Sequence, residues 1–175
     1  NVLTVTVTIN PGPTAPVLAG STNNPMVECQ GQTPLVATVA TTGTVTSVPV
    51  WYTGTTYVTT GTTYTPSTSV PGTTVYTIID SATVTGCSSL ATGNVLTLTV
   101  TINPNPTPPV ISGSTTNPFV QCQGGTPGVI TVAQTGTVTS IPVWYNGTAW
   151  VNTGTSYTPS TSIPGTTVYT IIDSA

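Results

Sequence analysis

Apolar and polar side chains alternate strictly over the first ten residues, NVLTVTVTIN. The threonines fall on one side of an extended backbone, and the large apolar side chains fall on the other. Those apolar residues are Leu3, Val5, Val7 and Ile9. An alternation with a period of two predicts a half-buried β-strand. Nearly the same segment, NVLTLTVTIN, occurs at 94–103, so the sequence predicts one strand twice.

Short strand-like segments separated by turn-forming residues fill the rest of the chain. Between residues 11 and 103 they read APVLAG, PMVECQ, LVATVAT, VPVWYTG, TYVTTG, TYTPS, TVYTIID and NVLTLTVTIN. Their Val, Ile, Thr and Tyr residues fit a pleated sheet, and no segment has an apolar period of 3.6 over a helical length. The pattern predicts an all-β chain built from two-sheet sandwiches of immunoglobulin-like type.

The chain is a tandem repeat with a period of 93 residues. Aligned without gaps, residues 1–82 and 94–175 are identical at 63 of 82 positions. A repeat of this length is a domain rather than one turn of a solenoid. We therefore expect a separate strand over 1–10, a complete domain over 11–103 and a second domain over 104–175.

The second domain stops at YTIIDSA, before a counterpart of the strand at 94–103. Burying the four apolar side chains of such a strand contributes about 1.5–3 kcal/mol each. A sandwich without this strand is therefore expected to have an open core groove and an unpaired sheet edge. We expect the groove between TVYTIID at 167–173 and the facing sheet. Its predicted residues are Val168, Tyr169, Ile171 and Ile172.

A surplus strand at one end and a missing strand at the other predict strand donation between subunits. Residues 1–10 of one subunit would complete the 104–175 domain of the next. Head-to-tail contacts that do not close into a ring generate open filaments. The expected partner is thus the chain itself, in a helical extracellular homopolymer.

A longer continuous array is the alternative explanation. Eleven residues equivalent to 83–93 would then join each 175-residue block to the next and restore a period of 186 residues. The chain does not begin with Met and has no signal-peptide pattern, so either a removed leader or a longer parent sequence is expected. In this alternative the protein is an adhesin stalk or a carbohydrate-binding surface protein.

Charge is nearly absent, which excludes several classes of partner. The chain has no Lys, Arg or His, and its acids are Glu28, Asp80 and Asp173. Nucleic-acid binding by phosphate neutralisation needs several basic residues, as does docking on anionic membranes. No apolar run approaches the ~20 residues of a membrane span. We therefore expect no nucleic-acid partner and no membrane span.

Catalysis, cofactors and metals are not expected either. Ser and Thr are abundant, but there is no His or Lys to activate a nucleophile. Asp80 and Asp173 are repeat equivalents in different domains, so they do not form a carboxylate pair. Oxygen ligands for Ca²⁺ usually come from Asp-rich loops, and this chain has none. Trp51 and Trp144 are predicted core residues.

Three cysteines give an odd count. Cys29 and Cys87 belong to the complete domain, and we expect a disulfide between them in an oxidising, extracellular setting. Cys122 is the counterpart of Cys29, but the counterpart of Cys87 would follow Ala175. In a continuous array Cys122 would bond to that residue, whereas with strand donation it would be a free thiol or pair between subunits.

Glycans are a further expected modification. The sequon NGT places Asn146 in a turn, where N-glycosylation can occur. Thr and Ser near Pro, as in NPGPTAP and NPNPTPP, indicate O-glycosylation. The corresponding threonines are Thr14 and Thr107.

The order of these motifs resembles a known group of modules. Four motifs carry the resemblance: an early Cys in VECQG, the Trp-Tyr strand VPVWYTG, the stretch TTYTPSTSVPGTTVYTIIDSATVTGCSS and the closing LTLTVTIN. In this order they are similar to the immunoglobulin-like modules that are strung together in bacterial surface proteins, above all in Bacteroidetes-type adhesins. The resemblance covers the whole chain and implies an immunoglobulin-like fold and a cell-surface location. It departs from the antibody pattern because Cys87 follows the TVYTIID strand instead of lying within it.

Overall fold

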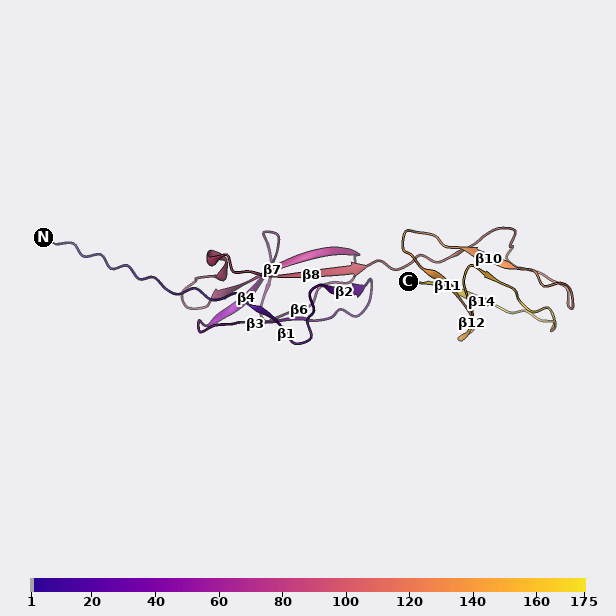
Figure 1. The fold of residues 1–175 in the computed structure, drawn as a ribbon, viewed down its shortest axis with the longest axis horizontal. Helices are drawn as coiled ribbons and strands as arrows, with labels where there is room; N and C mark the ends of the chain where they lie inside the picture. The colour runs from indigo at the N-terminus through magenta and orange to yellow at the C-terminus, as the bar shows by residue number, and fades with distance from the viewer. Residues whose placement is uncertain (1) are drawn as a thin grey trace. The chain divides into compact units, whose positions relative to one another are not determined.

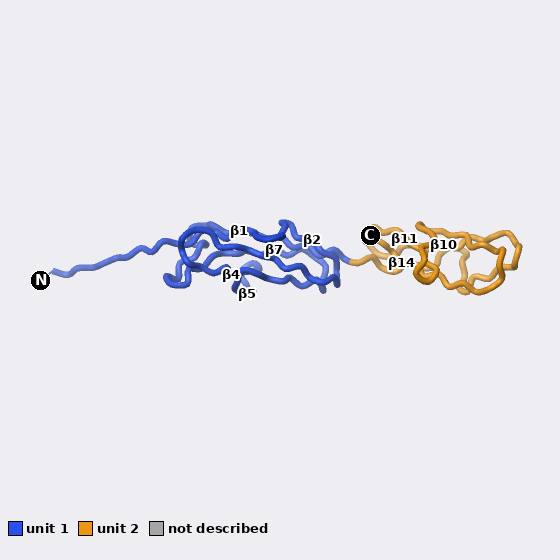
Figure 2. The backbone as a smooth tube through the Cα atoms, turned by 90° about the horizontal axis from the view of Figure 1, so that it is seen from below, with its two compact units in different colours: residues 1–104 blue, residues 105–175 orange. Residues whose placement is uncertain are grey.

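The computed structural model describes residues 2–175, which form two compact units. Unit 1 is Asn1–Pro104 and unit 2 is Asn105–Ala175 (Figure 2). Strands dominate both units, and one short 3₁₀ helix, η1 (Ser89–Thr92), occurs in unit 1. Among the described residues, no helix is long and apolar enough to cross a membrane. The all-β prediction is confirmed.

Unit 1 is a sandwich of a three-stranded and a five-stranded sheet (Figure 1). The smaller sheet has the order β1-β3-β6, and the larger has the order β2-β8-β7-β4-β5. Their bounds are β1 Val17–Ala19, β2 Met26–Cys29, β3 Ala37–Ala40, β4 Ser47–Thr53, β5 Thr56–Thr60, β6 Thr63–Tyr64, β7 Gly72–Ala82 and β8 Leu96–Asn103. These strands match the eight segments expected from the sequence, and the two-sheet arrangement is of immunoglobulin-like type.

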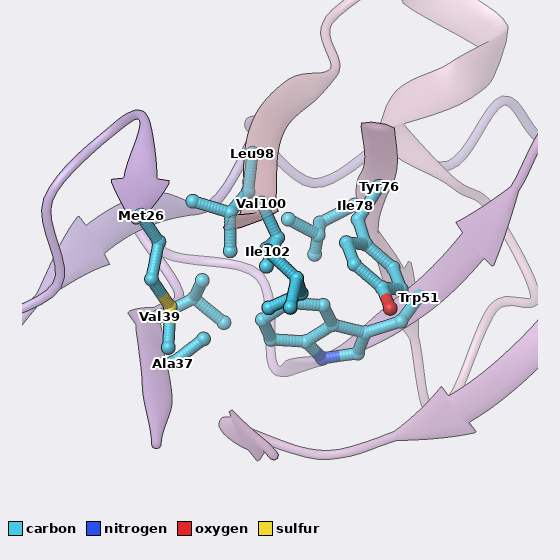
Figure 3. Packing of buried hydrophobic residues seen from close by; sticks show 9 residues of the cluster. All are labelled: Met26, Ala37, Val39, Trp51, Tyr76, Ile78, Leu98, Val100 and Ile102. Carbon is cyan, nitrogen blue, oxygen red and sulfur yellow. The ribbon is translucent and has the colours of Figure 1, made fainter. Parts of the chain in front are cut away.

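The core of unit 1 lies between the two sheets. Trp51 on β4 is fully buried and packs against Tyr64 and Tyr76, with ring centroids 5.6 and 6.4 Å away. Its indole Nε1 donates a 2.8 Å hydrogen bond to the carbonyl oxygen of Gly61, which satisfies the polar end of a buried ring. Around it lie Met26, Ala37, Val39, Ile78, Leu98, Val100 and Ile102 (Figure 3).

Unit 2 repeats this architecture with fewer strands. Its sheets have the orders β13-β10-β9 and β12-β11-β14. Their bounds are β9 Val110–Ile111, β10 Ile130–Ala133, β11 Ile141–Asn146, β12 Ala149–Thr153, β13 Ser156–Tyr157 and β14 Tyr169–Ser174. Trp144 is fully buried, like Trp51, and donates to the Gly154 carbonyl at 2.8 Å. The prediction that both tryptophans are core residues is confirmed.

The connection from β7 to β8 contains the one element that periodicity did not predict. The hydroxyl of Ser89, at the start of η1, accepts a 3.0 Å hydrogen bond from the Asp80 N–H of β7. Gly93 ends the turn with φ +73°, a left-handed conformation that favours glycine. The short helix therefore covers one end of β7.

Asp80 is a carboxylate buried at that end of the sheet. Its side chain is fully buried, and neither carboxylate oxygen has a hydrogen-bond partner among the described residues. Burial raises the pKa of Asp80 above its ordinary value of 3.8, while the nearby Ser47 hydroxyl lowers it in part. Between the ordinary and the raised pKa, the folded state binds more protons than the unfolded state. The contribution of Asp80 to stability is therefore fully present below pH 3.8 and is lost as the pH rises through the raised pKa.

Replacing Asp80 by Asn should stabilise unit 1 at pH 7, because the amide keeps the size of the side chain but carries no charge to desolvate. We expect an increase on the order of 1 kcal/mol, which corresponds to about 4–8 °C in Tm for a domain of this size. Thermal denaturation at pH 3 and pH 7 would check this. If the difference in Tm between pH 3 and pH 7 were the same in D80N as in the wild type, Asp80 would not be the source of this pH dependence.

Candidate functional site: an open strand groove in unit 2

Strand β8 lies between β2 and β7 in the larger sheet of unit 1. It runs parallel to β2, with Cys29 opposite Asn103, and antiparallel to β7, with Gly72 opposite Ile102. Its core-facing side chains are almost completely covered, with exposed fractions of 0% for Leu98, 2% for Val100 and 5% for Ile102. Both the hydrogen bonds and the apolar face of β8 are thus used within unit 1.

Unit 2 has a groove where unit 1 has β8. Its volume is about 1140 Å³, whereas unit 1 has a 390 Å³ pocket beside Tyr76 and Val100. The groove is lined by Trp144, Tyr157 and other residues from both sheets and the adjoining loops. Phe119 and Tyr169 also line it, and the ring of Tyr157 meets the ring of Tyr169 edge-on, with centroids 5.2 Å apart. The groove is therefore an opening into the hydrophobic core.

Core residues of unit 2 are less covered than their counterparts in unit 1. Four buried residues of unit 1 correspond to half-buried residues of unit 2. The pairs are Met26 with Phe119, Ala37 with Ile130, Tyr76 with Tyr169 and Ile78 with Ile171. The missing contacts are those that β8 makes in unit 1.

Two segments of unit 2 lack the strand partner that β8 provides in unit 1. β14 pairs with β11 on one side and is the edge of its sheet on the other. Residues 119–122, which correspond to β2, form no strand. Because β2 pairs with β8 alone, its counterpart has nothing to pair with. Both segments line the groove, so its two walls carry unpaired backbone groups.

At the end of the groove near Gln123, unit 2 has the same loop hydrogen bonds as unit 1, where β8 is present. Gly124 N–H donates to the Thr161 carbonyl at 2.9 Å, as Gly31 N–H donates to the Thr68 carbonyl at 3.0 Å. The Gln123 side chain donates to the Ser162 carbonyl at 3.1 Å. These bonds hold the loop walls in place without an inserted strand.

An asparagine sets the register of β8 in unit 1. The Asn24 side-chain Nδ2 donates to the Thr97 carbonyl at 2.8 Å, and its Oδ1 accepts from the Thr99 N–H at 2.9 Å. The amide thus binds two backbone groups two residues apart on one strand. Its counterpart Asn117 lines the groove of unit 2 with no hydrogen-bond partner for its side chain among the described residues. Periodicity does not identify this residue, because its role depends on a strand more than seventy positions away.

Three of the four groove residues expected from the sequence line the groove. Tyr169 and Ile171 line it and are half-buried, and Val168 lines it and is exposed. The prediction for Ile172 is wrong. Ile172 follows Ile171 on the strand and faces the other side of the sheet, where it is 46% exposed, whereas its counterpart Ile79 is 6% exposed. Phe119, which the sequence analysis did not select, is a groove residue instead.

The expected assembly strand is extended and exposed. Residues 2–10 form no strand pairing in the single chain (Figure 1). The exposed fractions of their four apolar side chains are 77% for Val5 and Val7, 87% for Ile9 and 89% for Leu3. Such a row of apolar residues is unusual on a protein surface unless it is an interaction site.

The predicted disulfide between Cys29 and Cys87 is contradicted. Cys29 ends β2 beside Asn103, level with the first residue of β7, Gly72. The Cys87 carbonyl accepts a 2.7 Å hydrogen bond from the N–H of Ala82, the last residue of β7. The eleven residues of β7 separate the two ends by about 30 Å, whereas a disulfide needs Cα atoms within about 7 Å. All three cysteines are free thiols in the single chain.

The three predicted glycosylation residues are exposed. Asn146 ends β11 before a turn at Gly147. The hydroxyl groups of Thr14 and Thr107 donate to the carbonyl oxygens of Thr42 and Thr135. A glycan on either threonine would replace the donated hydrogen. Both hydroxyls thus have a structural role within their units.

Other kinds of site are not formed by the described residues. No three Cys, Asp or Glu side chains among residues 2–175 gather where they could hold a metal ion. Glu28 accepts a 3.0 Å hydrogen bond from the Leu35 N–H. In unit 2 the neutral Gln121 makes the corresponding bond to Gly128, so a carboxylate is not required at this position.

Comparisons with known proteins identify no family. No family model and no curated protein sequence matches the chain. Solved structures similar to the chain include the fibronectin(III)-like modules of Clostridium thermocellum CbhA, with 13% identity, coverage of 90% of this chain and 84% of that chain, and a TM-score of 0.44. The titin A168–A169 tandem is 14% identical over 91% of this chain and 97% of that chain, with a TM-score of 0.33.

The Asn24 contact can be tested within unit 1. In Asn24→Ala, the Thr99 amide should lose a hydrogen-bond acceptor, and β8 should open more easily by about 1 kcal/mol. Hydrogen exchange of the Thr99 amide should then be roughly fivefold faster. Asn23→Ala, at the exposed neighbouring position, serves as the control. Equal exchange in the two variants would show that Asn24 does not hold the strand.

Proposed function

We propose that this chain is the structural subunit of an extracellular filament. In the filament, the N-terminal strand of one subunit, residues 2–10, fills the open groove in unit 2 of the next. The observation that carries the proposal is that β8, nearly identical in sequence to this strand, fills the same position in unit 1. This likeness supports the proposal that the strand of one copy fits the groove of another.

The repeat period assigns a place to each apolar side chain of the donated strand. Subtracting 93 from the residue numbers of β8 aligns the two strands, with one conservative difference at Val5, which is Leu in β8. The equivalences are Leu3 with Leu96, Val5 with Leu98, Val7 with Val100 and Ile9 with Ile102. Side chains that are exposed in the single chain would be buried against Trp144, Tyr157 and Tyr169.

The backbone pairing follows from the same equivalence. The donated strand would run antiparallel to β14 on one side and parallel to residues 119–122 on the other, as β8 does with β7 and β2. The Asn117 amide would bind the Thr4 carbonyl and the Thr6 N–H, the counterparts of the Thr97 and Thr99 groups. A one-residue slip would place threonines in the core and lose these bonds.

This contact is head-to-tail, because the strand and the groove belong to different parts of the chain. Such a contact repeats in an open series unless the geometry closes it into a ring. The partner is therefore a second copy of this chain, and the product is a linear polymer. The proposal includes an extracellular location. Exposed residues such as Asn146 could carry covalent glycans there, but assembly does not require them.

A continuous tandem array is the second candidate, and the 93-residue repeat favours it. In that case the strand and the groove would belong to one longer polypeptide that serves as an adhesin stalk. The two candidates differ in the behaviour of the 175-residue chain. Long uniform fibres in negative-stain images of the purified chain support the filament, and short rods support the array.

Replacing Val5 by Asp should abolish assembly, because it would place an unpaired carboxylate where Leu98 is fully buried in unit 1. Thr4→Asp is the matched control. It adds the same charge at the neighbouring position, whose counterpart Thr97 is exposed. Sedimentation and electron microscopy should find fibres for T4D and none for V5D. Fibres of normal length in V5D would overturn strand donation.

Replacing Asn117 by Ala should weaken assembly without preventing it. Two hydrogen bonds of about 0.5–1.5 kcal/mol each would be lost. The critical concentration should therefore rise roughly 5- to 150-fold. Ser114→Ala, an exposed position outside the groove lining, provides the control. An unchanged critical concentration in N117A would exclude the proposed register.

A further inference from the structure

The two ends of unit 1 place a cysteine beside equivalent asparagines. At one end, Cys29 is the register partner of Asn103 in the parallel β2–β8 pair. At the other end, the Cys87 sulfur lies 4.0 Å from the carbonyl oxygen of Asn10. Asn10 and Asn103 occupy the same position of the 93-residue repeat. Each asparagine follows the last apolar residue of its copy of the strand.

The segment after Asn10 is held against unit 1. Pro13 and Pro16 are buried, and proline has a restricted backbone. Gly12 lies close to the residue that follows Cys87, since a Cβ at Gly12 would be 3.8 Å from the Ser88 carbonyl oxygen. The position of Asn10 beside Cys87 is therefore part of the packing of unit 1. Asn10 therefore stays beside Cys87 when residues 2–9 insert into the groove of another subunit.

Insertion of the donated strand brings a second cysteine to the same asparagine. Cys122 of the acceptor is the counterpart of Cys29, and it is exposed at the end of the groove. In the register of β8, Cys122 lies opposite Asn10 of the donor, at the spacing of about 4.8 Å between neighbouring strands. Cys87 of the donor is already beside Asn10. Cys87 of the donor and Cys122 of the acceptor would thus both lie beside Asn10 of the donor.

We propose that Cys87 of the donor subunit and Cys122 of the acceptor subunit form a disulfide that locks the filament joint. This inference rests on the proposed strand donation and names the residues that make it irreversible under oxidising conditions. Each subunit would contribute Cys87 to one joint and Cys122 to the other. The bonds would therefore link all subunits of a filament in one covalent series.

The reaction needs a two-electron oxidant, for which a small-molecule disulfide is sufficient. One cysteine thiolate attacks the disulfide, forms a mixed disulfide and releases one small thiol. The second cysteine then displaces the other small thiol and forms the Cys87–Cys122 bond. The two electrons and two protons of the cysteines end on the two released thiols. Cys29 lies beside Asn103 of its own chain and would remain free.

The test uses the full chain with Cys29→Ser, which removes an exposed thiol outside the joint. The variant is assembled in a reducing buffer, examined by electron microscopy, transferred to oxidised glutathione and run on a non-reducing gel. We expect a ladder that extends well beyond the dimer, because each subunit carries two different linking residues. Mass spectrometry should find a peptide that joins Cys87 to Cys122.

Three further variants distinguish this link from others. With C29S/C87S or C29S/C122S, a single thiol remains, so the ladder should be lost while fibres persist. C87S, which keeps Cys29 and Cys122, should give fibres without a ladder. Fibres of C29S that yield no covalent species, or dimers only, would overturn the disulfide and leave strand donation intact. Absence of fibres from the reduced wild-type chain would overturn strand donation, and the disulfide with it.

Discussion

The structure depends on one strand that lies between two others. β8 pairs with β2 on one side and β7 on the other, and its alternate side chains complete the core around Trp51. Where this strand is present, β2 forms and the core is closed. Where it is absent, residues 119–122 form no strand, β14 is an edge and the core is open at a 1140 Å³ groove. Three differences between nearly identical sequences thus have one cause.

The scarcity of charge makes the fit of this strand between its neighbours more important. With no basic residue and three acids, the chain has no complementary charges for the association between copies that we propose. In that proposal, specificity would come from shape, from the alternation of apolar and polar residues in the strand and from backbone hydrogen bonds. The Asn24 amide in unit 1 illustrates how one neutral side chain determines register, since it binds a carbonyl and an N–H on the same strand. Asn117 offers the same groups at the open groove.

The proline-rich segment that follows the N-terminal strand is fixed on unit 1 by its packing. Thr14 and Thr107, at equivalent positions, both donate to a carbonyl of a neighbouring loop. Pro13 and Pro16 are buried, so the chain leaves unit 1 at a fixed point beside Cys87.

The sequence by itself determined the all-β class, the positions of the eight strands of unit 1 and the two core tryptophans. It also indicated the residues that line one wall of the groove. These features depend on local alternation and on the repeat, which one chain displays directly. The tertiary structure decided the rest. It placed Cys29 and Cys87 at opposite ends of β7, turned Ile172 away from the groove and brought Phe119 and Asn117 to its wall. Those outcomes depend on which segments lie side by side and on which face of a strand is covered, and neither is specified by spacing along the chain.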